Sequence, residues 1–205
     1  MPLILQLEIS SQQRLAVWEA TETEQELLEI ADLGDSLLEK YRSIKLEKRR
    51  QEWLVAKALL SHIGFNHQIE YLENGKPVVP GITHFSLSHC LPFVAFTENR
   101  HSTGLDIQTP DPKLERIQHR IFRPEEVENA QNSKSPLDYL TILWSAKEAV
   151  FKIYGENIHF AEQMKVLPFQ LTDDLIQCIY FHPEDEIMHE LKLLQIKGHW
   201  CVVAL

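Results

Sequence analysis

The stretch WSAKEAVFK, at residues 144–152, predicts a helix with two unlike faces. At about 100° per residue its two alanines and Val150 fall on one side, which we interpret as core. The other side carries one acid, two lysines and two aromatics: Trp144, Lys147, Glu148, Phe151 and Lys152. From the residues alone, two interpretations of that side remain open. It is either a Glu148–Lys152 salt bridge beside a secondary core or a functional face. We expect the helix to run from about Leu137 to Tyr154.

A short strand upstream brings in a second acid. In GLDIQ, residues 104–108, strand alternation puts Asp106 and Gln108 on one face. Mg²⁺ prefers hard oxygen ligands and often takes only one or two carboxylates. Asp106, the amide oxygen of Gln108 and Glu148 could therefore hold Mg²⁺, and a purely structural Asp106 is the open alternative.

A third segment places a hydroxyl and an imidazole together. In HFSLSH, residues 84–89, Ser88 and His89 stand at the end of an expected strand. Either side chain can donate a hydrogen bond to a phosphate oxygen. A structural histidine is the alternative, and a zinc pair of His84 with His89 is disfavoured because no third nitrogen or sulfur ligand is indicated.

The charge of the chain limits its partners. Its 205 residues carry 30 acids against 20 bases, a net charge of −10 that argues against general nucleic-acid binding. Residues 40–57 reverse this sign with seven bases, Lys40, Arg42, Lys45, Lys48, Arg49, Arg50 and Lys57, against two acids, Glu47 and Glu52. Most of them fall on a helix expected from Glu47 to Ile63, which is either an ordinary charged surface or an anion site.

The overall pattern predicts an α+β fold with two similar lobes, residues 1–102 and 103–205. Three cysteines without paired spacing suggest a reducing compartment. The first ten residues lack a basic leader, and no apolar run is long enough to span a membrane. We expect a cytoplasmic monomer.

Together these segments resemble one family. In order, GKP (75–77), SLSH (86–89), GLDIQ (104–108) and WSAKEAVFK (144–152) are similar to the motifs of 4'-phosphopantetheinyl transferases of the Sfp type. The resemblance spans roughly residues 40–155. It implies a pseudo-dimer of two α+β lobes, with coenzyme A and Mg²⁺ held in the cleft between them.

The same resemblance implies roles for individual residues. Asp106 and Glu148 would ligate Mg²⁺, and Gln108 would be a neutral third ligand where many members carry Glu. The residues implied in coenzyme A binding are Arg49, Arg50, Lys57, Lys76, Ser88, His89, Lys147 and Lys152. Asp106, Glu148 and Lys152 would be catalytic, with Glu148, directly or through water, as the base for the acceptor serine.

The implied reaction transfers 4'-phosphopantetheine from coenzyme A to a serine of an acyl or peptidyl carrier protein and releases 3',5'-ADP. This holo-[acyl-carrier-protein] synthase activity would serve fatty acid, polyketide or nonribosomal peptide synthesis. The acidic carrier would dock near four bases, Lys113, Arg116, Arg120 and Arg123. Two rivals stay open: a Mg²⁺-dependent phosphohydrolase and a non-catalytic binding protein.

Overall fold

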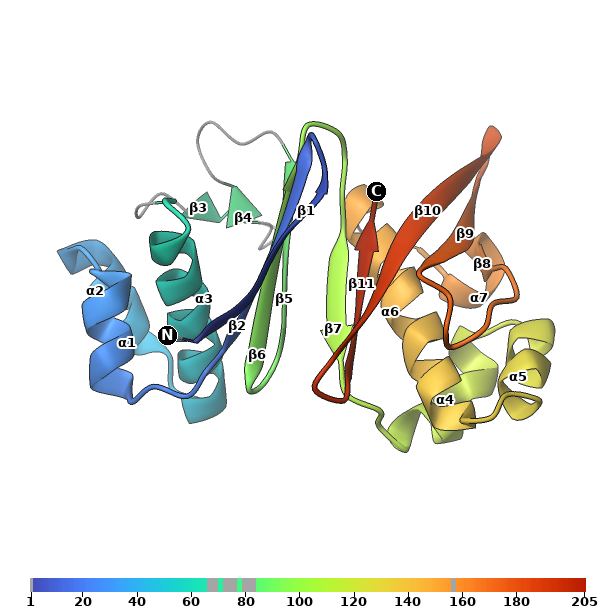
Figure 1. Cartoon of the computed structure of the whole chain (residues 1–205), viewed down its shortest axis with the longest axis horizontal. Helices are drawn as coiled ribbons and strands as arrows, with labels where there is room; N and C mark the ends of the chain where they lie inside the picture. Colours follow the sequence, from blue (N-terminus) through green and yellow to red (C-terminus); the bar gives the residue numbers. More distant parts are fainter. Residues whose placement is uncertain (1, 66–69, 72–76, 79–83, 156–157) are drawn as a thin grey trace. The chain divides into compact units, whose positions relative to one another are not determined.

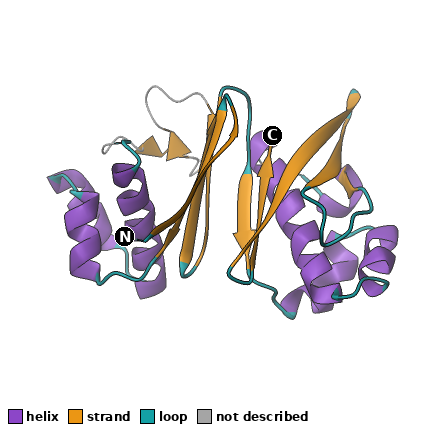
Figure 2. Ribbon diagram, viewed as in Figure 1, coloured by secondary structure: helices purple, strands orange, loops and turns teal. Residues whose placement is uncertain are grey.

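The computed structural model of the chain describes residues 2–65, 70–71, 77–78, 84–155 and 158–205. These residues form two compact units, Met1–His101 and Ser102–Leu205, which we call the N-terminal and C-terminal units. Each unit combines an antiparallel sheet with helices packed on one face of it (Figures 1 and 2). The expected α+β class is therefore confirmed.

The N-terminal unit has a four-stranded sheet in the order β1-β2-β6-β5. Its strands are β1 (Leu3–Ser10), β2 (Gln13–Glu19), β5 (His84–Cys90) and β6 (Phe93–Asn99). A separate pair, β3 (Glu70–Tyr71) and β4 (Pro77–Val78), is also antiparallel. The predicted site residue Lys76, in the expected GKP motif, lies outside the described residues.

The described residues of this unit also form three helices: α1 (Glu24–Ala31), α2 (Asp35–Ser43) and α3 (Glu47–His62). A capping box between Thr23 and Glu26 begins α1. Helix α3 contacts β2 and β6 and buries Leu54, Ala58 and Leu59 against the sheet. Its apolar side therefore faces the sheet, and two of its charged residues, Glu52 and Lys57, are buried as well.

The C-terminal unit has a five-stranded sheet in the order β7-β11-β10-β9-β8. The strands are β7 (Leu105–Gln108), β8 (Met164–Val166), β9 (Leu175–His182), β10 (Asp185–Ile196) and β11 (His199–Ala204). β10 turns into β11 through Lys197 and Gly198, both with positive φ. β7 is an edge strand paired with β11.

Four helices belong to this unit: α4 (Lys113–Ile121), α5 (Pro124–Gln131), α6 (Pro136–Tyr154) and α7 (Phe160–Gln163). Helix α6 starts with proline in its first turn and ends at Gly155, whose φ is 92°. It packs on β7 and β11, so the two expected site segments lie side by side. Within the described residues, no helix has the length and hydropathy needed to cross a membrane.

Candidate active site

Asp106 and Gln108 share the face of β7 that looks toward α6. The register pairs Asp106 with Val202 and Gln108 with Trp200, and both partners belong to the core beneath α6. Asp106 is only 3% exposed. The expected alternation of this strand is confirmed, and it turns a carboxylate toward the helix that carries Glu148.

Backbone contact brings β7 and α6 unusually close. A Cβ atom on Gly104, just before β7, would lie 1.8 Å from the carbonyl oxygen of Ala149. No side chain fits in that space, because the obstructing atom is helix backbone rather than a flexible group. Gly104 therefore lets the strand approach the helix one residue from Glu148.

Lys152 ties the two elements together. Its ammonium donates to the carbonyl of Leu105 at 2.6 Å and to Oδ1 of Asp106 at 3.1 Å. The Lys152 side chain remains about one quarter exposed, whereas that of Asp106 is buried. The lysine thus neutralises the aspartate and still presents part of its surface to solvent.

Glu148 lies in the electrostatic field of both residues. Burial and, to a smaller extent, the Asp106 carboxylate together raise the pKa of Glu148 to about 7, although the Lys152 ammonium opposes them. Two neighbouring carboxylates with one ammonium beside them form a site deficient in positive charge. We call Asp106 and Glu148 the acidic pair.

The donor set of the acidic pair fits Mg²⁺. The described residues contain no group of three His, Cys, Asp or Glu side chains suited to a metal ion. Mg²⁺ differs from zinc in that it is usually bound through one or two carboxylates, with water and substrate phosphates completing the octahedron. The repulsion within the acidic pair is what a divalent cation would relieve. Gln108 adds a neutral oxygen on the same strand face.

Lys147 is not part of this site, contrary to the sequence interpretation. Its side chain is 0% exposed, and its Nζ lies 2.6 Å from Oε2 of Glu126, itself 1% exposed. The ammonium also donates to the carbonyls of Ile121, Phe160 and Met164 at 3.2–3.4 Å. Burial lowers the pKa of Lys147, and Glu126 opposes that shift. An ammonium so enclosed cannot bind coenzyme A, so we withdraw that role.

The basic residues of α3 divide into two groups. Arg49 approaches Glu52 at 3.9 Å, and His89 of β5 approaches the same carboxylate at 3.5 Å. Arg50 instead lies over the ring of Tyr41, 5.9 Å from its centroid. The structure therefore brings Arg49 and His89 to the same carboxylate and places Arg50 against Tyr41 instead.

Lys57 belongs with the second group. Its ammonium lies 5.2 Å from the centroid of the Trp53 ring, and burial together with Lys40 lowers its pKa to about 8. Trp53 in turn packs against Tyr41. Lys57 is thus a buried ammonium near Trp53 of its own helix and Lys40 of α2.

Ser88 and His89 point to opposite faces of β5. Ser86 and Ser88 are buried, whereas Leu87 packs toward the core under α3 and His89 reaches Glu52 of that helix. Adjacent strand residues alternate in direction, so the hydroxyl and the imidazole cannot meet one phosphate from the same side. The sequence interpretation gave no role to Glu52, which stood out only as one of two acids, with Glu47, among the bases of this segment.

Arg123 is also separated from its expected group. Its guanidinium donates to the carbonyls of Met164 at 2.9 Å and Glu162 at 2.6 Å and lies over the Phe181 ring. These contacts hold α5 to β8 and α7, so Arg123 is not available for docking. Lys113, Arg116 and Arg120 are exposed on α4 and occupy one stripe at spacings of three and four residues.

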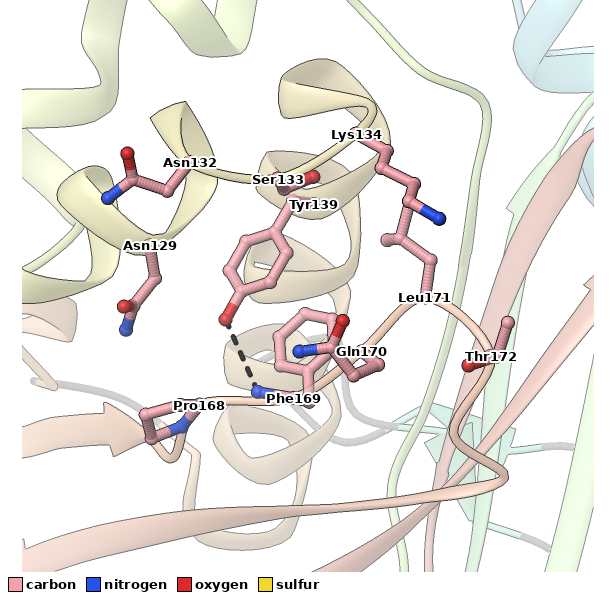
Figure 3. A pocket seen from close by; sticks show the side chains of 10 residues that line it. All are labelled: Asn129, Asn132, Ser133, Lys134, Tyr139, Pro168, Phe169, Gln170, Leu171 and Thr172. Atoms are coloured by element: carbon pink, nitrogen blue, oxygen red, sulfur yellow. Dashed lines mark hydrogen bonds between the residues drawn. The ribbon is translucent and has the colours of Figure 1, made fainter.

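A pocket of about 380 Å³ opens elsewhere in the C-terminal unit, where α5 ends and α6 begins (Figure 3). The Tyr139 ring stacks on Phe169 at 4.0 Å, and the Tyr139 hydroxyl accepts a hydrogen bond from the Phe169 amide. Its remaining lining is mostly amide and hydroxyl side chains: Asn129, Asn132, Ser133, Gln170 and Thr172, with Lys134, Pro168 and Leu171. None of the residues expected in the active site lines it.

Comparison with models of protein families identifies a superfamily for part of the chain. A model of the 4'-phosphopantetheinyl transferase superfamily matches residues 102–204, a range that contains β7, α6 and the acidic pair. No curated protein matches the chain.

Proposed function

This chain belongs to the 4'-phosphopantetheinyl transferase superfamily, and on that premise we propose that it transfers phosphopantetheine from coenzyme A to a serine of a carrier protein. The observation that supports the proposal is the convergence of Asp106, Glu148 and Lys152 in the matched unit. Two carboxylates and an ammonium at one point suit a diphosphate bound with Mg²⁺.

Asp106 and Glu148 would hold Mg²⁺, and Gln108 would offer a weak or water-mediated oxygen. When bound, Mg²⁺ would neutralise negative charge on the diphosphate as transfer proceeds. The partly exposed ammonium of Lys152 would bind a phosphate oxygen while its contact with Leu105 keeps the side chain in place. Charge neutralisation and positioning of this kind supply most of the catalysis in phosphoryl transfer.

The acceptor serine must lose its proton as it attacks. Its oxygen forms a bond to the β-phosphorus of coenzyme A, the bridging bond to the α-phosphate breaks, and 3',5'-ADP leaves with that bond's electrons. We assign the serine proton to Glu148, directly or through a water, because a carboxylate can accept a proton and the neutral amide of Gln108 cannot.

We propose that the acidic carrier docks on the basic stripe of α4. Lys113, Arg116 and Arg120 are exposed, whereas Leu114 and Ile117 pack inward. Charge complementarity of this kind increases association rates. Arg116→Glu with Arg120→Glu should raise the KM for the carrier and leave the KM for coenzyme A unchanged. Lys134→Glu, an exposed lysine beside the pocket, is the matched control; equal effects of both changes would reject docking on α4.

The decisive experiment is mass spectrometry of an apo carrier protein incubated with this protein, coenzyme A and Mg²⁺. A gain of the phosphopantetheine mass, abolished by Glu148→Gln, supports the transferase. Release of phosphate from coenzyme A without modification of the carrier would favour a phosphohydrolase. Binding of coenzyme A without either product would favour a non-catalytic protein.

A further inference from the structure

A buried hydroxyl on α6 has no hydrogen-bond partner. Ser145 is 0% exposed, and among the residues that the structure describes its Oγ atom has neither a donor nor an acceptor within reach. Thr141, one turn earlier on the same helix and equally buried, donates to the carbonyl of Leu137 at 2.8 Å. Serine and threonine inside a helix can satisfy their hydroxyls in that way. Ser145 makes no such bond to the carbonyl of Thr141.

Folding stability does not account for this hydroxyl. A buried hydroxyl without a partner lowers stability, because it loses its hydrogen bonds to water when the chain folds. Alanine would fill nearly the same space on α6 without that cost. Such a group in a native structure calls for an explanation, for example a part in catalysis or in the binding of an ion.

The contacts of α6 with its neighbouring strands fix its direction relative to β7. At the start of β7, Gly104 lies against the backbone of Ala149. At the end of β7, Gln108 pairs with Trp200, and the Trp200 indole donates to Asp138 in the first turn of α6. The start of the strand thus lies beside a late turn of the helix, and the end of the strand beside an early one. β7 and α6 therefore run in opposite directions.

This direction places Asp106 and Ser145 at one level. Asp106 follows Gly104 by two strand residues, about 7 Å. Ser145 precedes Ala149 by four helical residues, about 6 Å. Because strand and helix run in opposite directions, both steps lead the same way. Ser145 also lies three residues before Glu148, on the same stripe of α6, so the unpartnered hydroxyl belongs beside the acidic pair.

Asp106 needs another donor when substrate binds. In the structure, the ammonium of Lys152 donates to Oδ1 of Asp106 at 3.1 Å. In the proposed function the same ammonium binds a phosphate oxygen of coenzyme A, which draws it away from the aspartate. A carboxylate that ligates a metal is oriented by hydrogen bonds from groups behind it. An ionised carboxylate only accepts hydrogen bonds, and a serine hydroxyl can donate one.

We propose that Ser145 is a positioning residue, which donates a hydrogen bond to the Asp106 carboxylate when Mg²⁺ and coenzyme A are bound. The proposal rests on the proposed function for the identity of the metal and the substrate. Ser145 contacts neither of them: it orients Asp106 and so allows Lys152 to bind the diphosphate. The buried hydroxyl then has its partner in the loaded enzyme.

Binding of Mn²⁺ in the presence of coenzyme A tests this role without a carrier protein. Mn²⁺ takes the same oxygen ligands as Mg²⁺, and electron paramagnetic resonance measures its free concentration. Ser145→Ala should weaken Mn²⁺ binding on the order of tenfold, because a ligating carboxylate loses the bond that orients it. Ser145→Cys, with a weaker donor, should lie between alanine and wild type. Thr141→Val is the matched control and should leave the Mn²⁺ affinity unchanged. Equal affinities in wild type and Ser145→Ala would overturn the proposal.

Urea unfolding of the metal-free protein supplies a readout that separates positioning from a structural role. Ser145→Ala should not lower the urea midpoint, because its hydroxyl has no bond to lose in this state. Thr141→Val should lower it, because the carbonyl of Leu137 loses its donor. A lower midpoint in Ser145→Ala with an unchanged Mn²⁺ affinity would show a structural hydroxyl and reject the positioning role.

Transfer assays distinguish this proposal from the proposed function. In the active enzyme, Ser145→Ala should raise the Mg²⁺ concentration needed for half-maximal rate, and saturating Mg²⁺ should restore most of kcat. A wild type that modifies no carrier would reject the proposed function, and the Mn²⁺ affinities would still decide the role of Ser145. A wild type that binds no Mn²⁺ with coenzyme A would reject the positioning role. Should Ser145→Ala not fold, Ser145→Cys must weaken Mn²⁺ binding, or the proposal is wrong.

Discussion

Replacement of Lys147 by methionine should destabilise the C-terminal unit and leave the affinity for coenzyme A unchanged. Methionine fills most of the space of lysine, so the change removes chiefly the charge. It leaves the buried Glu126 carboxylate without its cation and removes the hydrogen-bond donor of three backbone carbonyls. A residue in direct contact with coenzyme A would behave in the opposite way, with a raised KM and unchanged stability.

The expected loss of stability depends on which hydrogen bonds Glu126 keeps in the variant. Removal of one partner of a buried ion pair costs about 3–5 kcal/mol. Glu126 would still accept hydrogen bonds from the amides of Val166 and Arg123, both at 2.8 Å. Two of its contacts therefore survive, and we expect the low end of the range, about 3 kcal/mol. The exposed pair of Lys165 and Glu125, at 3.5 Å, is the matched control, and Lys165→Met should cost about 0–1 kcal/mol.

Amide hydrogen exchange at Val166 is the assay, because that amide donates to Glu126. A loss of about 3 kcal/mol corresponds to exchange roughly a hundredfold faster. The double change Glu126→Gln with Lys147→Met should recover much of the protection, since no charge is then left buried. Unchanged exchange at Val166 in Lys147→Met, together with a raised KM for coenzyme A, would refute the reasoning and return Lys147 to the substrate site.

Four further outcomes follow from the geometry of the two sites. Glu148→Gln should abolish transfer while circular dichroism shows an intact fold, and full activity at saturating Mg²⁺ would remove Glu148 from both of its roles. The folded pKa of Glu148 is raised from 4.5 to about 7. Its contribution to the stability of the metal-free protein should therefore be fully present below pH 4.5 and lost as the pH rises through 7, by up to about 3 kcal/mol. Urea unfolding at several pH values should show this fall in wild type and a flatter dependence in Glu148→Gln. Gln108→Glu should lower the Mg²⁺ concentration needed for half-maximal rate, and Gln108→Ala should raise it modestly. Asp106→Ala should nearly eliminate activity. Coincident Mg²⁺ titrations of wild type and both Gln108 variants would show that Gln108 does not approach the metal. Arg49→Ala should raise the KM for coenzyme A by the equivalent of about 1.5–3 kcal/mol and Arg50→Ala by much less, and equal effects of the two would contradict the division of the α3 bases.

Sequence patterns were sufficient where structure depends on neighbours along the chain. The helix expected from about Leu137 to Tyr154 is observed as Pro136–Tyr154, because its periodicity and its Gly155 stop are local signals. The alternation in β7 correctly placed Asp106 and Gln108 on one face. By contrast, β2 was missed because its residues 15–18 are all buried and show no alternation, and the three-residue β8 is too short for a pattern.

Contacts between distant residues could not be read from these patterns. Lys147 stands next to Glu148 in the sequence, but its partner Glu126 is 21 positions upstream, so a helical projection put both on one functional face. Arg123 was grouped with the bases of α4, although its acceptors Met164 and Glu162 lie about 40 positions downstream. In both cases an acceptor that is distant in the sequence decides whether a base serves packing or a ligand.

The close approach at Gly104 has a mechanical consequence. Because backbone meets backbone there, repacking of side chains cannot bring β7 closer to the middle of α6 at this point. The backbone itself therefore limits how near the strand of Asp106 comes to the helix of Glu148. A methyl group added at residue 104 would have no room there, so the helix, with the Glu148 carboxylate, would have to move away from the strand.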